Sequence, residues 1–201
     1  MAHNRLEGSA GADPADIVMD PAERSAIAHA TAQLLVSRQA TGEDSERVEK
    51  LVSFAEEHGL DTLAELWSSA HPVTLPGALW RLYLVKAALS HNLHDASEVF
   101  SRGLEGLKGI DAVVVGAPNP LSPQAFLVIL DDILRGAFQG EFALALERAS
   151  AVARAVSAGV ISLPPESETN DYQLSSQALR WSIISDELAL SAKKAAEGLL
   201  L

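Results

Sequence analysis

Helical spacing of apolar residues is the feature that most limits the folds open to this chain. Apolar side chains recur three and four residues apart in one segment after another. The chain has 33 Ala and 29 Leu among its 201 residues, and these are the apolar types with the strongest helix preference. We therefore predict an all-α fold, a single-domain bundle of about eight helices with a long C-terminal helix.

Capping and stop signals place the expected helices. Asp20-Pro21-Ala22-Glu23, for example, supplies a capping residue, a proline at the first helical position and a glutamate that completes a capping box. The expected helices cover residues 20–41, a segment that stops at Gly59, 61–71, 74–92, a segment that starts at Asp95, 122–138, 141–158 and 171–198. The valine run Val113–Val115 has no β-rich partner, and we leave open whether it is helical or extended.

The chain divides into a leader, a domain and an internal linker. Residues 1–19 lack an apolar period and are expected to form a flexible N-terminal leader. Residues 20–201 form the helical domain. The polar stretch 160–170, which contains Pro164-Pro165, is a linker before the last helix.

Three segments are expected to build the core: 74–92, 122–138 and 141–158. The first is apolar nearly all round, which is typical of a helix at the centre of a bundle. The last carries many small residues on its inner face, so a neighbouring helix can approach closely. Gly159 is placed to cap its C-terminal end.

Charge and composition exclude several functions. The net charge is −12, and Lys193-Lys194 is the one adjacent basic pair, which argues against nucleic-acid binding by this chain alone. The chain has no cysteine, which rules out disulfides and thiolate chemistry and fits a reducing compartment. No stretch is apolar for long enough to cross a membrane. We expect an acidic cytoplasmic protein.

No catalytic or metal-binding arrangement is evident in the sequence. His91 and His94 are three residues apart, but a helix is expected to end between them and no third ligand is identifiable. Asp131 and Asp132 are adjacent and so point in different directions on a helix; we expect Asp131 to pair with Arg135. We therefore predict no catalytic residue, no metal site, no cofactor and no enzymatic activity.

Trp80, Arg81 and Tyr83 are the candidate ligand-binding residues. They lie in the apolar segment 74–92, where an indole can line a cavity and a buried cation needs an anionic partner or ligand. The alternative interpretation is that tryptophans such as Trp67 and Trp80 fill the core.

The last expected helix, 171–198, has apolar residues on two sides. One series runs through Leu174, Trp181 and Leu188 with a companion series through Ala192 and Leu199. Leu179, Ile183 and Leu190 lie on another side. Two stripes favour two neighbours, one within the chain and one in a partner subunit, although both stripes can also be buried within the chain. We predict the first set as an interface: Leu174, Trp181, Leu188, Ala192 and Leu199.

Two blocks of the sequence resemble segments of a group of uncharacterised all-helical actinobacterial proteins. The blocks are LPGALWRLYL at Leu75–Leu84 and GAFQGEFALALERA at Gly136–Ala149. Some of those proteins carry the generic name "DNA-binding protein". The resemblance implies a helical fold and assigns no site residue.

These observations favour a non-enzymatic cytoplasmic interaction or regulatory module that forms a homodimer or binds another protein. Two alternatives remain open. One is a small-molecule-binding bundle with a pocket near Trp80. The other is a nucleic-acid-associated regulatory protein.

Overall fold

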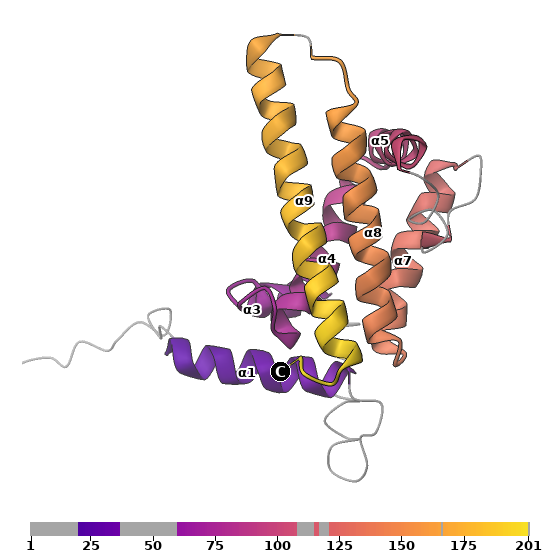
Figure 1. The fold of residues 1–201 in the computed structure, drawn as a ribbon. Helices are drawn as coiled ribbons and strands as arrows, with labels where there is room; N and C mark the ends of the chain where they lie inside the picture. Colours follow the sequence, from indigo (N-terminus) through magenta and orange to yellow (C-terminus); the bar gives the residue numbers. More distant parts are fainter. Residues whose placement is uncertain (1–19, 37–59, 108–114, 117–120, 166, 201) are drawn as a thin grey trace, which may run out of the picture.

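A computed structural model describes residues 20–36, 60–107, 115–116, 121–165 and 167–200. Within these residues the regular structure is entirely helical, and seven helices follow one another without a strand (Figure 1). They are α1 (Pro21–Val36), α3 (Leu60–Trp67), α4 (Leu75–His91), α5 (Leu93–Gly106), α7 (Pro123–Phe138), α8 (Phe142–Ile161) and α9 (Glu168–Ala196). The all-α prediction with a long C-terminal helix is confirmed.

Several predictions fall outside the described residues. These are the leader 1–19, the expected helix that stops at Gly59 and the conformation of residues 113–114. The polar linker is shorter than expected, because α8 continues to Ile161 and α9 already begins at Glu168. Among the described helices, none combines the length and the apolar content needed to cross a bilayer.

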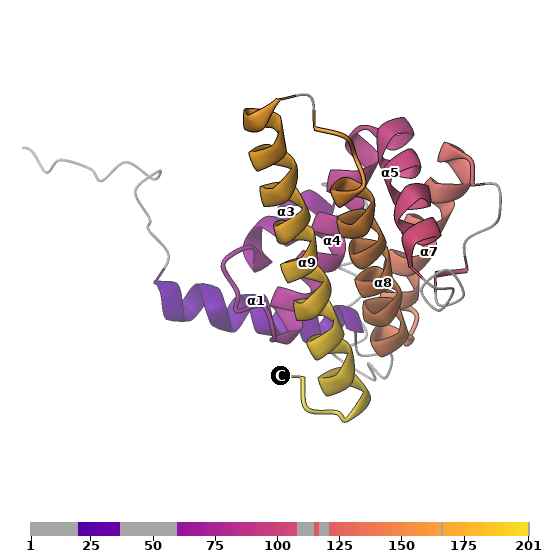
Figure 2. The same cartoon turned by 45° about the horizontal axis from the view of Figure 1, so that its top comes forward.

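The core is built mainly around α8. Thirteen of its twenty residues are buried, and it packs against α9 on one side and against α5 and α7 on the other (Figures 1 and 2). The expected central helix, α4, does contact every other described helix. However, its Ala87 and Ala88 are exposed. α8 is more deeply buried than α4 because its alanine, serine and glycine residues are small. They let α5, α7 and α9 approach α8 closely.

Two glycines make the contact between α5 and α8. A Cβ atom added to Gly103 would lie 1.7 Å from the carbonyl oxygen of Ala155, and one added to Gly159 would lie 1.9 Å from that of Val99. The prediction of Gly159 as a C-terminal cap is wrong, since α8 runs on to Ile161 and Ser162 caps it. Both positions lie inside helices, and both are glycine because the crossing backbones leave no room for a side chain.

Buried serines connect α8 to α9, which lie antiparallel and side by side (Figure 1). The hydroxyl of Ser150 donates to the carbonyl oxygen of Ser185 over 2.9 Å, and the hydroxyl of Ser185 donates to that of Ser150 over 3.0 Å. Two helical turns away, the hydroxyl of Ser157 donates to the carbonyl oxygen of Ala178 over 2.8 Å. These bonds specify how α9 is aligned along α8.

Gly198 ends α9. It has a positive φ of 68°, which a glycine adopts without strain. The amide of Leu199 donates to the carbonyl oxygen of Lys194 and the amide of Gly198 to that of Ala195, the pattern of a Schellman motif. The chain then turns back, and Leu200 packs against the core.

Candidate functional site

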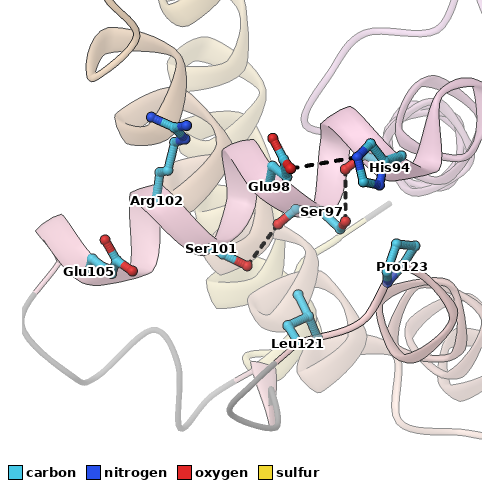
Figure 3. Close-up of a pocket in the computed structure, with 8 residues that line it drawn as sticks. All are labelled: His94, Ser97, Glu98, Ser101, Arg102, Glu105, Leu121 and Pro123. Atoms are coloured by element: carbon cyan, nitrogen blue, oxygen red, sulfur yellow. Dashed lines mark hydrogen bonds and ion pairs between the residues drawn. The ribbon is translucent and has the colours of Figure 1, made fainter.

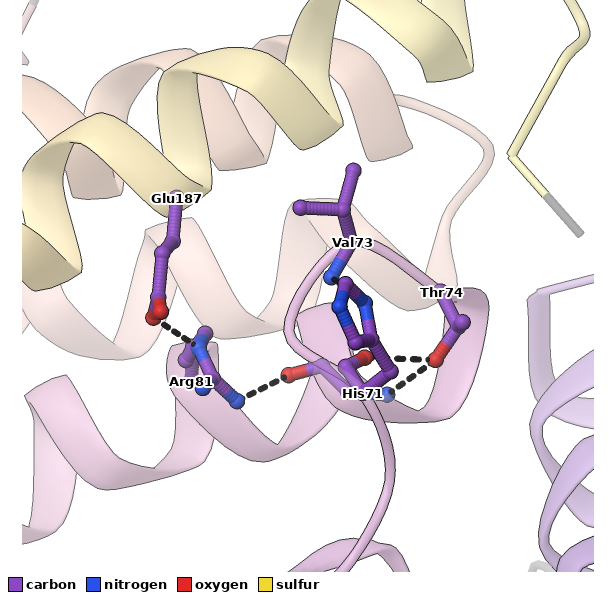
Figure 4. Close-up of polar contacts among 6 residues, drawn as sticks. His71, Val73, Thr74, Arg81 and Glu187 are labelled. Atoms are coloured by element: carbon purple, nitrogen blue, oxygen red, sulfur yellow. Dashed lines mark hydrogen bonds and ion pairs between the residues drawn. The ribbon is translucent and has the colours of Figure 1, made fainter.

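The residues expected to bind a ligand are joined to other helices. The guanidinium of Arg81 forms an ion pair with Glu187 of α9 and donates to the carbonyl oxygen of Gly77 over 3.3 Å (Figure 4). The hydroxyl of Tyr83 donates to Asp61 Oδ1 of α3 over 2.6 Å. The Trp80 ring stacks on that of Tyr83 with 5.6 Å between centroids.

The hydrogen bond to Asp61 also changes the acidity of Tyr83. The pKa of the phenol is raised, first because the bond holds the proton, then through partial burial and through repulsion of a tyrosinate by the Asp61 carboxylate. Arg81 and Tyr83 therefore have anionic partners within the chain. They need no external ligand, and a pocket near Trp80 stays a prediction.

Lys86 and Arg135 have carboxylate partners as well. Lys86 Nζ lies 2.7 Å from Asp131 Oδ1 and so joins α4 to α7. Arg135 pairs with Asp132 at 2.7 Å. The predicted pair of Asp131 with Arg135 is therefore wrong. Asp131 points toward α4, because adjacent residues on a helix face different directions.

His91 and His94 lie on two successive helices. His91 ends α4, Asn92 caps the next helix, and His94 lies in the first turn of α5, with its Nε2 3.5 Å from Glu98 Oε1. No group of three potential ligands occurs in the described part of the chain. Trp67, in contrast to the histidines, fills the core. It is buried, and its indole nitrogen donates to the hydroxyl of Thr31 over 3.1 Å.

A surface pocket of about 370 Å³ follows α5 (Figure 3). One wall carries side chains of alternating charge and two serines, and the other is formed by Leu121 and Pro123. The hydroxyl of Ser97 donates to the backbone carbonyl of His94 over 2.8 Å and not to its ring, so the pair is not a nucleophile with its base. The mixed charges favour no ligand class.

The structure corrects the choice of interface residues on α9. Trp181, Leu188 and Ala192 are buried within the chain, so they are not accessible to a partner. Leu174 is half-buried and packs against the core. Leu199 is exposed, but it lies beyond the end of the helix.

The exposed apolar side chains of α9 are Tyr172, Leu179, Ile183 and Leu190. Their exposed fractions are 75%, 61%, 48% and 48%, respectively. Spaced seven, four and seven residues apart, they lie on one line along the helix, which we call the outer stripe. α9 packs mainly on α8, with a smaller contact to α4.

The sequence contained a signal for the correct assignment. Ala178, Ser185 and Ala192 are small residues seven apart, and small residues mark the side on which two helices approach closely. The stripe next to them is therefore the inner one. The apolar spacing in the sequence also predicts Leu179, Ile183 and Leu190 as a separate side of the helix, and the structure adds Tyr172 to it.

No protein-family model, curated protein or solved structure matches the chain. The resemblance of Leu75–Leu84 and Gly136–Ala149 to actinobacterial helical proteins stays a prediction.

Proposed function

We propose that this chain is a non-enzymatic helical interaction module that forms a homodimer through the outer stripe of α9. The observation that supports the proposal is the line of four large apolar side chains left exposed on one helix. Apolar residues scattered singly over a surface need no explanation, whereas four large ones aligned on one side of a helix favour an interaction site.

The size of the stripe indicates a weak dimer. Burying the exposed half of a large apolar side chain contributes about 1 kcal/mol, so eight side chains from two copies contribute roughly 8 kcal/mol. The loss of free motion on association costs roughly 4 to 15 kcal/mol. Even at the lower cost the balance is about −4 kcal/mol, which corresponds to a Kd of about 1 mM, so we expect the dimer to form only at high protein concentrations.

Sedimentation of the full chain over a range of concentrations tests the proposal. The wild type is expected to dimerise, and the double variant Leu179→Gln/Ile183→Gln to stay monomeric. Val128→Gln is the matched control, because Val128 is 57% exposed on α7 and lies outside the stripe. A monomeric wild type at the highest concentration, or a double variant that dimerises as well as the control, would refute the proposal.

We also propose a cytoplasmic location, which the lack of cysteine supports. The two alternative functions stay predictions. The polar partners of Arg81 and Tyr83 give no support to a small-molecule pocket, and the net charge of −12 gives none to nucleic-acid binding.

A further inference from the structure

We infer that the outer stripe pairs with the same stripe of a second copy in the antiparallel direction, about a twofold axis beside residue 181. The inference rests on the proposed dimer and adds its geometry. Its basis is the spacing of the stripe: Tyr172 and Leu190 lie nine residues before and after position 181, and Leu179 and Ile183 lie two before and after it.

This symmetry has a direct consequence for packing. A twofold contact requires that if one residue touches another, the reverse contact also forms. In the antiparallel arrangement Tyr172 lies opposite Leu190 of the second copy, and Leu179 opposite Ile183. Every exposed apolar side chain of the stripe thus meets another apolar side chain.

Charged residues on the same line favour the antiparallel over the parallel direction. Asp186 and Lys193 are both exposed and continue the spacing of the stripe. A parallel pair would place Asp186 against Asp186 and Lys193 against Lys193, and like charges that face each other across an interface oppose association. In the antiparallel pair, Asp186 lies opposite Ser176 and Lys193 opposite Thr169.

Arg180 provides an independent test because it lies on the flank of the stripe, one residue from the axis. The antiparallel pair brings the two Arg180 side chains together, whereas a parallel pair places each beside Ser175. Arg180→Ala is therefore expected to tighten the antiparallel dimer roughly twofold to fivefold, the size of an exposed charge pair. An unchanged or weakened affinity would contradict the antiparallel direction.

Disulfide trapping measures the direction itself. Because the natural chain has no cysteine, Tyr172→Cys and Leu190→Cys each carry a single thiol. In the antiparallel dimer, thiols of the same variant are about 27 Å apart along the helix, too far for a disulfide. Thiols of the two different variants lie opposite each other.

Mild oxidation of each variant alone and of the mixture, with one variant lengthened by a tag, gives distinct products on a non-reducing gel. We expect the mixed disulfide in the mixture and no product from either variant alone or from Val128→Cys. Products from each variant alone would overturn the antiparallel arrangement while leaving the dimer intact. If sedimentation shows a dimer but no product forms, the stripe is not the contact. A monomer would refute the proposed function as well.

Discussion

Replacing Gly103 with alanine tests the contact between α5 and α8. The new Cβ atom would lie 1.7 Å from the carbonyl oxygen of Ala155 and 2.9 Å from the amide nitrogen of Gly159. Both are backbone atoms, so no side chain can rotate away. Gly106, three residues later in the same helix, is the matched control, since a Cβ atom there meets nothing within 4 Å.

The expected magnitude follows from the required displacement. The two helices must separate by at least about 1.3 Å to bring the closest approach to 3.0 Å. Serine hydrogen bonds join α8 to α9, and α7 packs on its other side, so α8 cannot move without disturbing those contacts. Overpacking of this kind costs about 3 kcal/mol, against a gain in helix propensity of about 1 kcal/mol. The net loss of stability is about 2 kcal/mol.

Thermal unfolding followed by circular dichroism measures the difference. For a chain of this size, Gly103→Ala is expected to lower the Tm by about 4 to 8 °C. Gly106→Ala should leave the Tm unchanged or raise it by a few degrees, because it adds helix propensity at the end of α5 without a clash. A Gly103→Ala variant that melts at or above the wild type would refute the close approach of the two backbones.

Two further predictions concern polar side chains. Ser150→Ala should lower the free energy of unfolding by about 1 kcal/mol through loss of its bond to α9. Ser191→Ala should raise it, because the buried Ser191 hydroxyl has no hydrogen-bond partner among the described residues. Chemical denaturation measures both effects, and equal effects would contradict the assignment. The raised pKa of Tyr83 means that its bond to Asp61 stabilises the fold below pH about 10 and is lost as the pH rises through the pKa of the folded state. Asp61→Asn should lower that pKa, as measured by tyrosinate absorbance in a chain whose other tyrosine is replaced by Tyr172→Phe.

The features that the sequence predicted well depend on residues within one helical turn. Asp20 Oδ1 accepts a hydrogen bond from the amide of Ala22, and Ser122 caps α7 by accepting from the amide of Ala125. Such caps and the spacing of apolar residues are local, so the helix order and most boundaries could be predicted. The expected helix that stops at Gly59 lies outside the described residues.

The features that the sequence did not reveal depend on which helices cross. Gly159 resembles a C-terminal cap until the position of α5 is known. Glu187 is 106 residues from Arg81, and no local pattern selects it as the partner. The apolar character of Trp181 and Leu179 does not separate the two stripes of α9 either, and only the small residues Ala178, Ser185 and Ala192 mark the side that meets α8.

The exposed apolar side chains of the outer stripe lower the solubility of the chain and would bring no benefit to a monomer. Lysine or glutamate at positions 179 and 183 would be as compatible with a helix as Leu179 and Ile183, and more favourable for solubility. In a monomer their replacement by glutamine should leave stability almost unchanged. In a dimer that binds through the stripe, association adds to the stability of the folded state, so the Tm of the wild type should rise with protein concentration. The double variant should lose that dependence while keeping the Tm of the dilute wild type.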